Sequence, residues 1–87
     1  LLEAMAAGLP VVAANGAPMN EIVRDNVSGL LFEKDNKSHL AAQILKLIGD
    51  DSLRARLGSE GRRKAIEDYS AEKILIRFRD LYKKIAG

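Results

Sequence analysis

Only two segments of the 87-residue chain have the character of β-strands, and both are short. Residues 9–14 form an apolar run rich in β-branched residues, which ends at the turn-forming pair Asn15-Gly16. Residues 29–32 form the second run, directly after a stretch of turn formers. The segment between the two runs has room for one short helix, at residues 20–24. The order strand, helix, strand predicts a pair of parallel strands.

Such a pair is not a complete fold. Parallel sheets are normally buried between helices and have more than two strands, whereas this pair would have two exposed edges. We therefore expect further parallel strands and helices to precede residue 1. The predicted fold class is α/β, specifically the C-terminal portion of a Rossmann-like doubly wound parallel sheet domain. It ends in three helices and is incomplete as an isolated chain.

Helical signals flank the two strands. Residues 1–7 are good helix formers that Gly8 stops. Asn36 is a predicted N-cap of a helix that ends at Gly49. The apolar face of this helix is predicted to contain Leu40, Ile44, Leu47 and Ile48.

Two more helices follow in the second half of the chain. Asp50 or Asp51 is expected to cap the first, although Gly58 and Gly61 weaken the prediction that it is continuous. Its predicted inward positions are Leu53, Leu57, Ala65 and Ile66. Ser70 is the predicted N-cap of the last helix. The apolar stripe of that helix contains Ile74, Leu75, Phe78, Leu81, Tyr82 and Ile85.

Composition is that of a soluble globular protein, with 47% hydrophobic and 30% charged residues. The chain has no cysteine for disulfides or thiolate metal sites, and its single histidine, His39, cannot form a zinc site alone and is expected on the surface. No apolar run approaches the roughly 20 residues that a membrane-spanning helix needs. We therefore expect no metal and no cofactor, and a cytoplasmic location, at the inner face of the membrane if the parent protein associates peripherally with it.

The charge is unevenly distributed along the chain. Residues 1–51 carry four bases and seven acids, whereas residues 52–87 carry ten bases and five acids. A basic half can indicate nucleic-acid binding. Here acidic residues interrupt the bases and few aromatic residues are available for base stacking, so we interpret this half as a solvated helix surface and expect no nucleic-acid partner.

Four blocks of sequence resemble one known family. Residues 2–13 read LEAMAAGLPVVA, residues 16–23 read GAPMNEIV, residues 29–32 read GLLF and residues 52–58 read SLRARLG. In this order and with these spacings, the blocks closely resemble glycosyltransferase family 4 (group 1), whose members have the GT-B fold. The resemblance covers nearly the whole chain. It implies that residues 1–87 form part of the nucleotide-sugar-binding domain, the C-terminal part of the GT-B C-terminal domain.

The resemblance also implies a site residue. The family uses two glutamates separated by seven residues, and Glu3 matches the second of them. Its implied role is to accept hydrogen bonds from the ribose hydroxyls of the donor nucleotide, which suits an ionised carboxylate. Glu21 is a second candidate for substrate binding, in the loop before the short helix, where a structural role in capping that helix is the favoured interpretation.

The implied reaction is retaining transfer of a sugar from a nucleotide diphosphate sugar to an acceptor hydroxyl, without a metal. The first glutamate of the pair is expected eight positions before Glu3, with the diphosphate-binding turn and basic residues also upstream. No catalytic residue is therefore assigned within the chain, and residues 1–87 alone are expected to be inactive. The expected partners are the nucleotide-sugar donor and the missing N-terminal part of the same protein, or a second copy of the chain.

A second class of function stays open. The missing half of the sheet and the apolar stripe of residues 74–85 are also typical of a non-catalytic α/β or helical module for oligomerisation or interaction.

Overall fold

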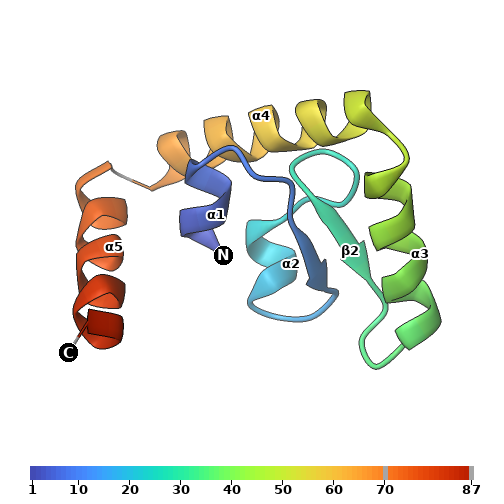
Figure 1. Ribbon diagram of the computed structural model, residues 1–87, viewed down its shortest axis with the longest axis horizontal. Helices are drawn as coiled ribbons and strands as arrows, with labels where there is room; N and C mark the ends of the chain where they lie inside the picture. Colours follow the sequence, from blue (N-terminus) through green and yellow to red (C-terminus); the bar gives the residue numbers. More distant parts are fainter. Residues whose placement is uncertain (70, 87) are drawn as a thin grey trace.

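The computed structural model of the protein describes residues 1–69 and 71–86. Helices and strands alternate in the first half of the chain, and three helices follow (Figure 1). In chain order the elements are α1 (Leu2–Ala6), β1 (Val12–Ala14), α2 (Met19–Ile22), β2 (Leu30–Phe32), α3 (Lys37–Ile48), α4 (Asp51–Asp68) and α5 (Ala71–Ala86). The predicted order of elements is thus confirmed. The predicted N-cap Ser70 lies outside the described residues.

The two strands form a parallel pair in which Val12 lies opposite Leu30 and Ala14 opposite Phe32. Within the described ranges, β2 is the only strand that pairs with β1, so the other edge of β1 is open. β1 is shorter than predicted. The backbone N–H of Leu9 donates to the Ala4 carbonyl of α1 (3.0 Å), and residues 9–11 form a connection between the helix and the first strand residue, Val12.

Helices cover the strand pair on both sides. α2 contacts β1, while α3 contacts both strands and α4 packs across α1 and α3 (Figure 1). The buried side chains form two clusters. One joins α1, α4 and the segments flanking the strands and contains Leu2, Met5, Val11, Val23 and Ala65. The other joins β2, α3 and α4 and contains Leu30, Leu47, Leu53 and Leu57.

α4 is one continuous helix in spite of its two glycines. A Cβ atom at Gly58 would collide with the carbonyl oxygen of Gly8, and one at Gly61 would lie 3.0 Å from the Ser28 carbonyl oxygen. Gly8 itself has a φ of +79°, a conformation that favours glycine. The glycines of α4 therefore allow close backbone packing and do not interrupt the helix.

The two predicted caps of α3 and α4 are present. The Asn36 side chain accepts a hydrogen bond from the His39 backbone N–H (2.9 Å), and the Asp50 side chain accepts one from Leu53 (2.9 Å). Each cap satisfies one of the backbone donors that a helix leaves free in its first turn. α3 ends before Gly49, as predicted.

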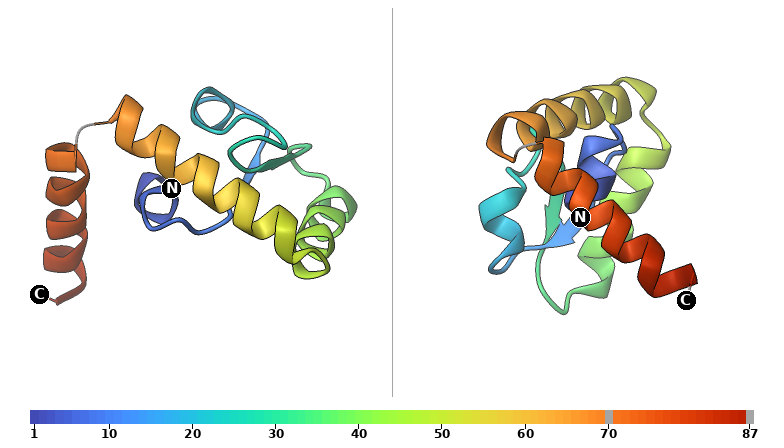
Figure 2. Two further views of the ribbon diagram at one scale, coloured as in Figure 1. Left: turned by 90° about the horizontal axis from the view of Figure 1, so that it is seen from above. Right: turned by 90° about the vertical axis from the view of Figure 1, so that its left-hand side faces the viewer.

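Several predicted apolar faces are wrong in part. Leu47 of α3 is buried, but Ile44 and Ile48 are exposed, and so is Ile66 of α4. α5 extends away from the rest of the chain on the side of α1 (Figure 2). Its described apolar side chains are largely exposed, namely Leu75, Ile76, Phe78, Leu81, Tyr82 and Ile85. The cause is the same throughout, since no other described element covers these positions.

No helix in the described part of the chain is long and apolar enough to cross a membrane.

Candidate functional site

Glu3 lies in the first turn of α1, and its carboxylate is half-buried. Its own backbone N–H hydrogen-bonds to the carboxylate, and this holds the pKa of Glu3 below its ordinary value. Desolvation opposes the shift, while the positive charge of Arg77 assists it. The carboxylate of Glu3 is therefore ionised at neutral pH.

The course of the chain brings Glu3 to one end of the sheet. α1 ends at Ala6, and the backbone reverses direction around Gly8 before β1 begins. The N-terminus of α1 and the carboxyl end of β1 consequently lie toward the same side of the molecule (Figure 1). In open α/β sheets this is the side on which ligands bind.

Glu21 occupies a different position, on the exposed surface of α2. The helix begins after Pro18 and has no side-chain cap at its N-terminus, so Glu21 does not cap it. The favoured structural interpretation of Glu21 is wrong in this respect.

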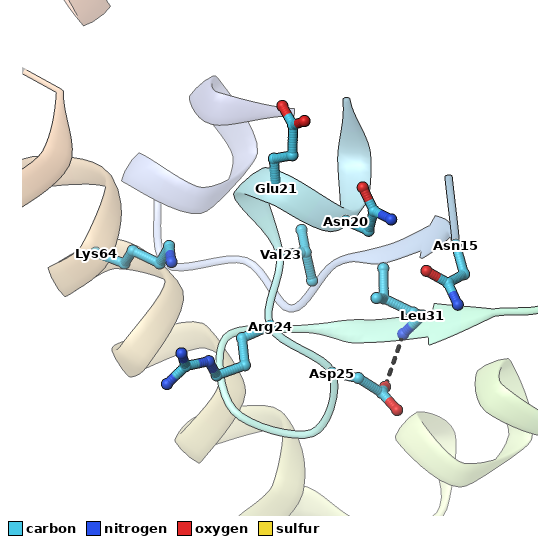
Figure 3. Close-up of a pocket in the computed structure, with 8 residues that line it drawn as sticks. All are labelled: Asn15, Asn20, Glu21, Val23, Arg24, Asp25, Leu31 and Lys64. Atoms are coloured by element: carbon cyan, nitrogen blue, oxygen red, sulfur yellow. Dashed lines mark hydrogen bonds between the residues drawn. The ribbon is translucent and has the colours of Figure 1, made fainter. Parts of the chain in front are cut away.

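Glu21 lines a cleft of about 360 Å³ between α2, β2 and α4 (Figure 3). The lining is mostly polar and consists of Asn15, Asn20, Glu21, Val23, Arg24, Asp25, Leu31 and Lys64. Asp25 accepts a hydrogen bond from the backbone N–H of Leu31 (2.9 Å). Glu3 is not among the residues that line this cleft.

A second cleft, of about 510 Å³, lies at the carboxyl ends of both strands. Ala14 and Phe32 form its strand side, and the loop and first turn that lead into α3 contribute Lys34, Asp35, Asn36, Lys37 and Leu40. None of these residues was predicted from the sequence to belong to a binding site. Their place immediately after the second strand was the available signal, because strand ends in α/β sheets line ligand clefts.

The described residues contain no group of three or more histidine, aspartate or glutamate side chains placed to hold a metal ion.

Comparisons with known proteins identify the family. Residues 1–64 match the family model of the glycosyl transferases group 1. The chain is 36% identical over 85 residues to an uncharacterised glycosyltransferase of Methanocaldococcus jannaschii, covering 98% of this chain and 24% of that protein. It is 37% identical over 83 residues to a poly(ribitol-phosphate) alpha-N-acetylglucosaminyltransferase of Staphylococcus aureus, covering 94% of this chain and 17% of that enzyme.

A solved structure agrees with the sequence matches. The sucrose-phosphate synthase of Thermosynechococcus elongatus superposes with a TM-score of 0.77 at 28% identity, over 97% of this chain and 21% of that one. The chain belongs to the glycosyl transferases group 1 family, and its α/β fold is the predicted portion of a GT-B sheet domain. It spans about a quarter or less of the length of the relatives described above.

Proposed function

We propose that the chain is part of the nucleotide-sugar-binding domain of a retaining glycosyltransferase. The whole enzyme would transfer a sugar from a nucleotide diphosphate sugar to an acceptor hydroxyl. The observation that carries this proposal is the family match over residues 1–64, which includes Glu3 and both strands. The relatives named as glycosyltransferases support it.

Glu3 is the residue to which we assign a role in the donor site. Two vicinal hydroxyl groups of a ribose can each donate to one oxygen of an ionised carboxylate, and such charge-assisted hydrogen bonds are stronger than neutral ones. The lowered pKa of Glu3 keeps it in the acceptor form that this role requires. Its side chain is 23% exposed, so it is partly accessible to a ligand.

The chemical step depends on groups outside residues 1–87. The departing diphosphate needs cationic side chains and helix N-terminal amides to stabilise its charge as it develops. We expect these groups, and the glutamate that contacts the donor sugar, to lie upstream of residue 1, as the resemblance implies. We therefore assign no catalytic residue here.

An assay of sugar transfer tests the proposal. The intact protein, supplied with a panel of nucleotide diphosphate sugars and acceptors, is expected to release nucleoside diphosphate and to form a glycoside with the anomeric configuration of the donor. The proton spectrum of the product reports that configuration. Residues 1–87 alone are expected to give neither transfer nor donor hydrolysis. Inversion of configuration would refute the retaining mechanism. Activity of the isolated chain would refute the expectation that the groups needed for the chemical step lie upstream of residue 1.

A second candidate is an interaction module, favoured by the exposed apolar side chains of α5. Leu75 is 66% exposed, Tyr82 is 72% exposed and Ile85 is 78% exposed. If association is the function of the chain itself, residues 1–87 should form a discrete oligomer whose mass by light scattering is independent of nucleotide. The Leu75→Glu and Ile85→Glu variants should then be monomeric.

A further inference from the structure

The outer edge of β2, which faces away from β1, has an unusual set of hydrogen bonds. Alternate residues of a strand direct their backbone groups to opposite edges. Leu30 N–H donates to the Val11 carbonyl (2.9 Å), and the Phe32 carbonyl accepts from Asn15 N–H (2.8 Å), so these groups face β1. Leu31 and Glu33 consequently direct their backbone groups to the outer edge.

Three side chains satisfy three of these four outward groups, and the fourth, the Glu33 carbonyl, accepts a hydrogen bond from the Asn36 backbone N–H (3.0 Å). Asp25 accepts from Leu31 N–H (2.9 Å), and the Gln43 amide donates to the Leu31 carbonyl (2.8 Å). The Nδ1 atom of His39 accepts from Glu33 N–H (2.7 Å). We call Asp25, His39 and Gln43 the edge closure.

The edge closure has a simple origin in the sequence. His39 and Gln43 are four residues apart in α3, so they lie on the same face of the helix, one turn from each other. α3 packs along β2 and presents both side chains to the strand. Asp25 reaches the same edge from the loop that precedes the strand.

The edge closure makes the two sides of the sheet unequal. An edge with free N–H and C=O groups can pair with another strand, and proteins commonly block such edges. Here side chains occupy the backbone groups on the outer side of β2, whereas β1 has no second strand beside it in the described ranges. A further strand can therefore pair with the free edge of β1, whereas the outer edge of β2 is blocked.

One of the three contacts depends on protonation. A backbone N–H can only donate, so Nδ1 of His39 must be the unprotonated nitrogen of a neutral imidazole. An imidazolium carries protons on both nitrogens and cannot accept this bond. Gln43 contributes an amide, which is not ionisable.

We propose that His39 makes the edge closure pH-dependent. The neutral imidazole closes the end of β2 at Glu33, and protonation releases this N–H and loosens residues 33–36. That segment lines the second cleft, so its shape changes with the same proton. The proposal is independent of the proposed donor site.

The surroundings of His39 contain charges of both signs. The Glu33 carboxylate accepts a hydrogen bond from the Asn36 amide (3.2 Å), which holds it beside the same loop. The ionisable groups of the elements that meet at His39 are Glu33, Lys34, Asp35, Lys37 and, on the adjacent part of the edge, Asp25. An attraction between the imidazolium and Glu33 could hold the ring nearby, but it would not restore the bond to the backbone N–H.

Nuclear magnetic resonance on the 15N-labelled protein tests the proposal. Spectra are recorded from about pH 8 to about pH 5, the range in which imidazole groups of proteins change charge. We expect an unprotonated Nδ1 in His39 at the upper end, and an upfield shift of the Glu33 amide proton as His39 becomes protonated. The Leu31 amide proton, which is bonded to Asp25, should stay in place and serves as an internal control.

The matched variant is His39→Gln. A glutamine carbonyl oxygen can accept the Glu33 N–H bond and does not titrate, so the Glu33 amide of this variant should be insensitive to pH over the same range. A wild-type Glu33 amide that does not respond to pH would overturn the proposal, as would a variant with the same response. The tautomer of His39 can be measured on the wild-type protein without any variant. A proton on Nδ1 at the upper end of the pH range would also refute the proposal.

Discussion

Gly58 and Gly61 allow α4 to lie directly against backbone atoms of two other segments. Gly58 faces the carbonyl oxygen of Gly8, and Gly61 faces the carbonyl oxygen of Ser28. From the sequence alone, glycine in a helical pattern argues against continuity, since its helix propensity is low. The continuity of α4 could not be predicted from the local sequence. Each glycine makes room for the backbone of a residue more than thirty positions away in the chain.

Gly58→Ala should destabilise the protein. A methyl group at this position meets backbone, which cannot move aside as a flexible side chain can. Overpacking of this kind costs about 1–3 kcal/mol, and we expect a cost in the upper part of that range. Alanine has a higher helix propensity than glycine, which offsets roughly 1 kcal/mol of this cost. The free energy of unfolding from urea titration should fall by about 2 kcal/mol. Gly16→Ala is the control, because its Cβ would meet nothing within 4 Å. Equal stability of the two variants would contradict the packing argument.

The ends of the helices, in contrast, could be predicted from the residues of each helix and its immediate neighbours. The Asn36 cap of α3, the end of α3 before Gly49 and the Asp50 cap of α4 all follow from local chemistry that a short segment contains. Helix faces were less predictable. Ile44, Ile48 and Ile66 have the spacing of inward positions, but burial depends on whether another element lies opposite, and the described residues supply none. Strand length was overestimated at β1 for a related reason, since Leu9 is bonded to α1.

Asp50→Ala should weaken α4 at its N-terminus. The substitution removes the acceptor of the Leu53 N–H bond and typically costs about 1 kcal/mol. The neighbouring Ser52→Ala is the control, since Ser52 is exposed and an uninvolved surface substitution stays within roughly 0.5 kcal/mol. Thermal unfolding of both variants distinguishes the two outcomes. A loss for Asp50→Ala no greater than that of Ser52→Ala would show that the cap does not stabilise the helix.

At the scale of the whole molecule, the described residues form a small two-stranded sheet with helices on both sides, and among them no strand pairs with the second edge of β1. The fold class was predictable because two short strands without further partners implied a larger parallel sheet, and the family match and the structural match agree with that interpretation. The candidate site was less accessible to sequence reasoning. Glu3 came only from the resemblance, and the two clefts are formed by residues that no local pattern brings together.

Binding of nucleoside diphosphates to the intact protein, measured by calorimetry with wild type and Glu3→Ala, tests the central claim most directly. Loss of hydrogen bonds to a charged group costs about 1.5–3 kcal/mol, so the dissociation constant should rise by roughly 10- to 100-fold. Glu67→Ala, at an exposed glutamate of α4, is the control and should bind as wild type does. An unchanged affinity in a folded Glu3→Ala protein would contradict the assignment of Glu3 to the donor ribose.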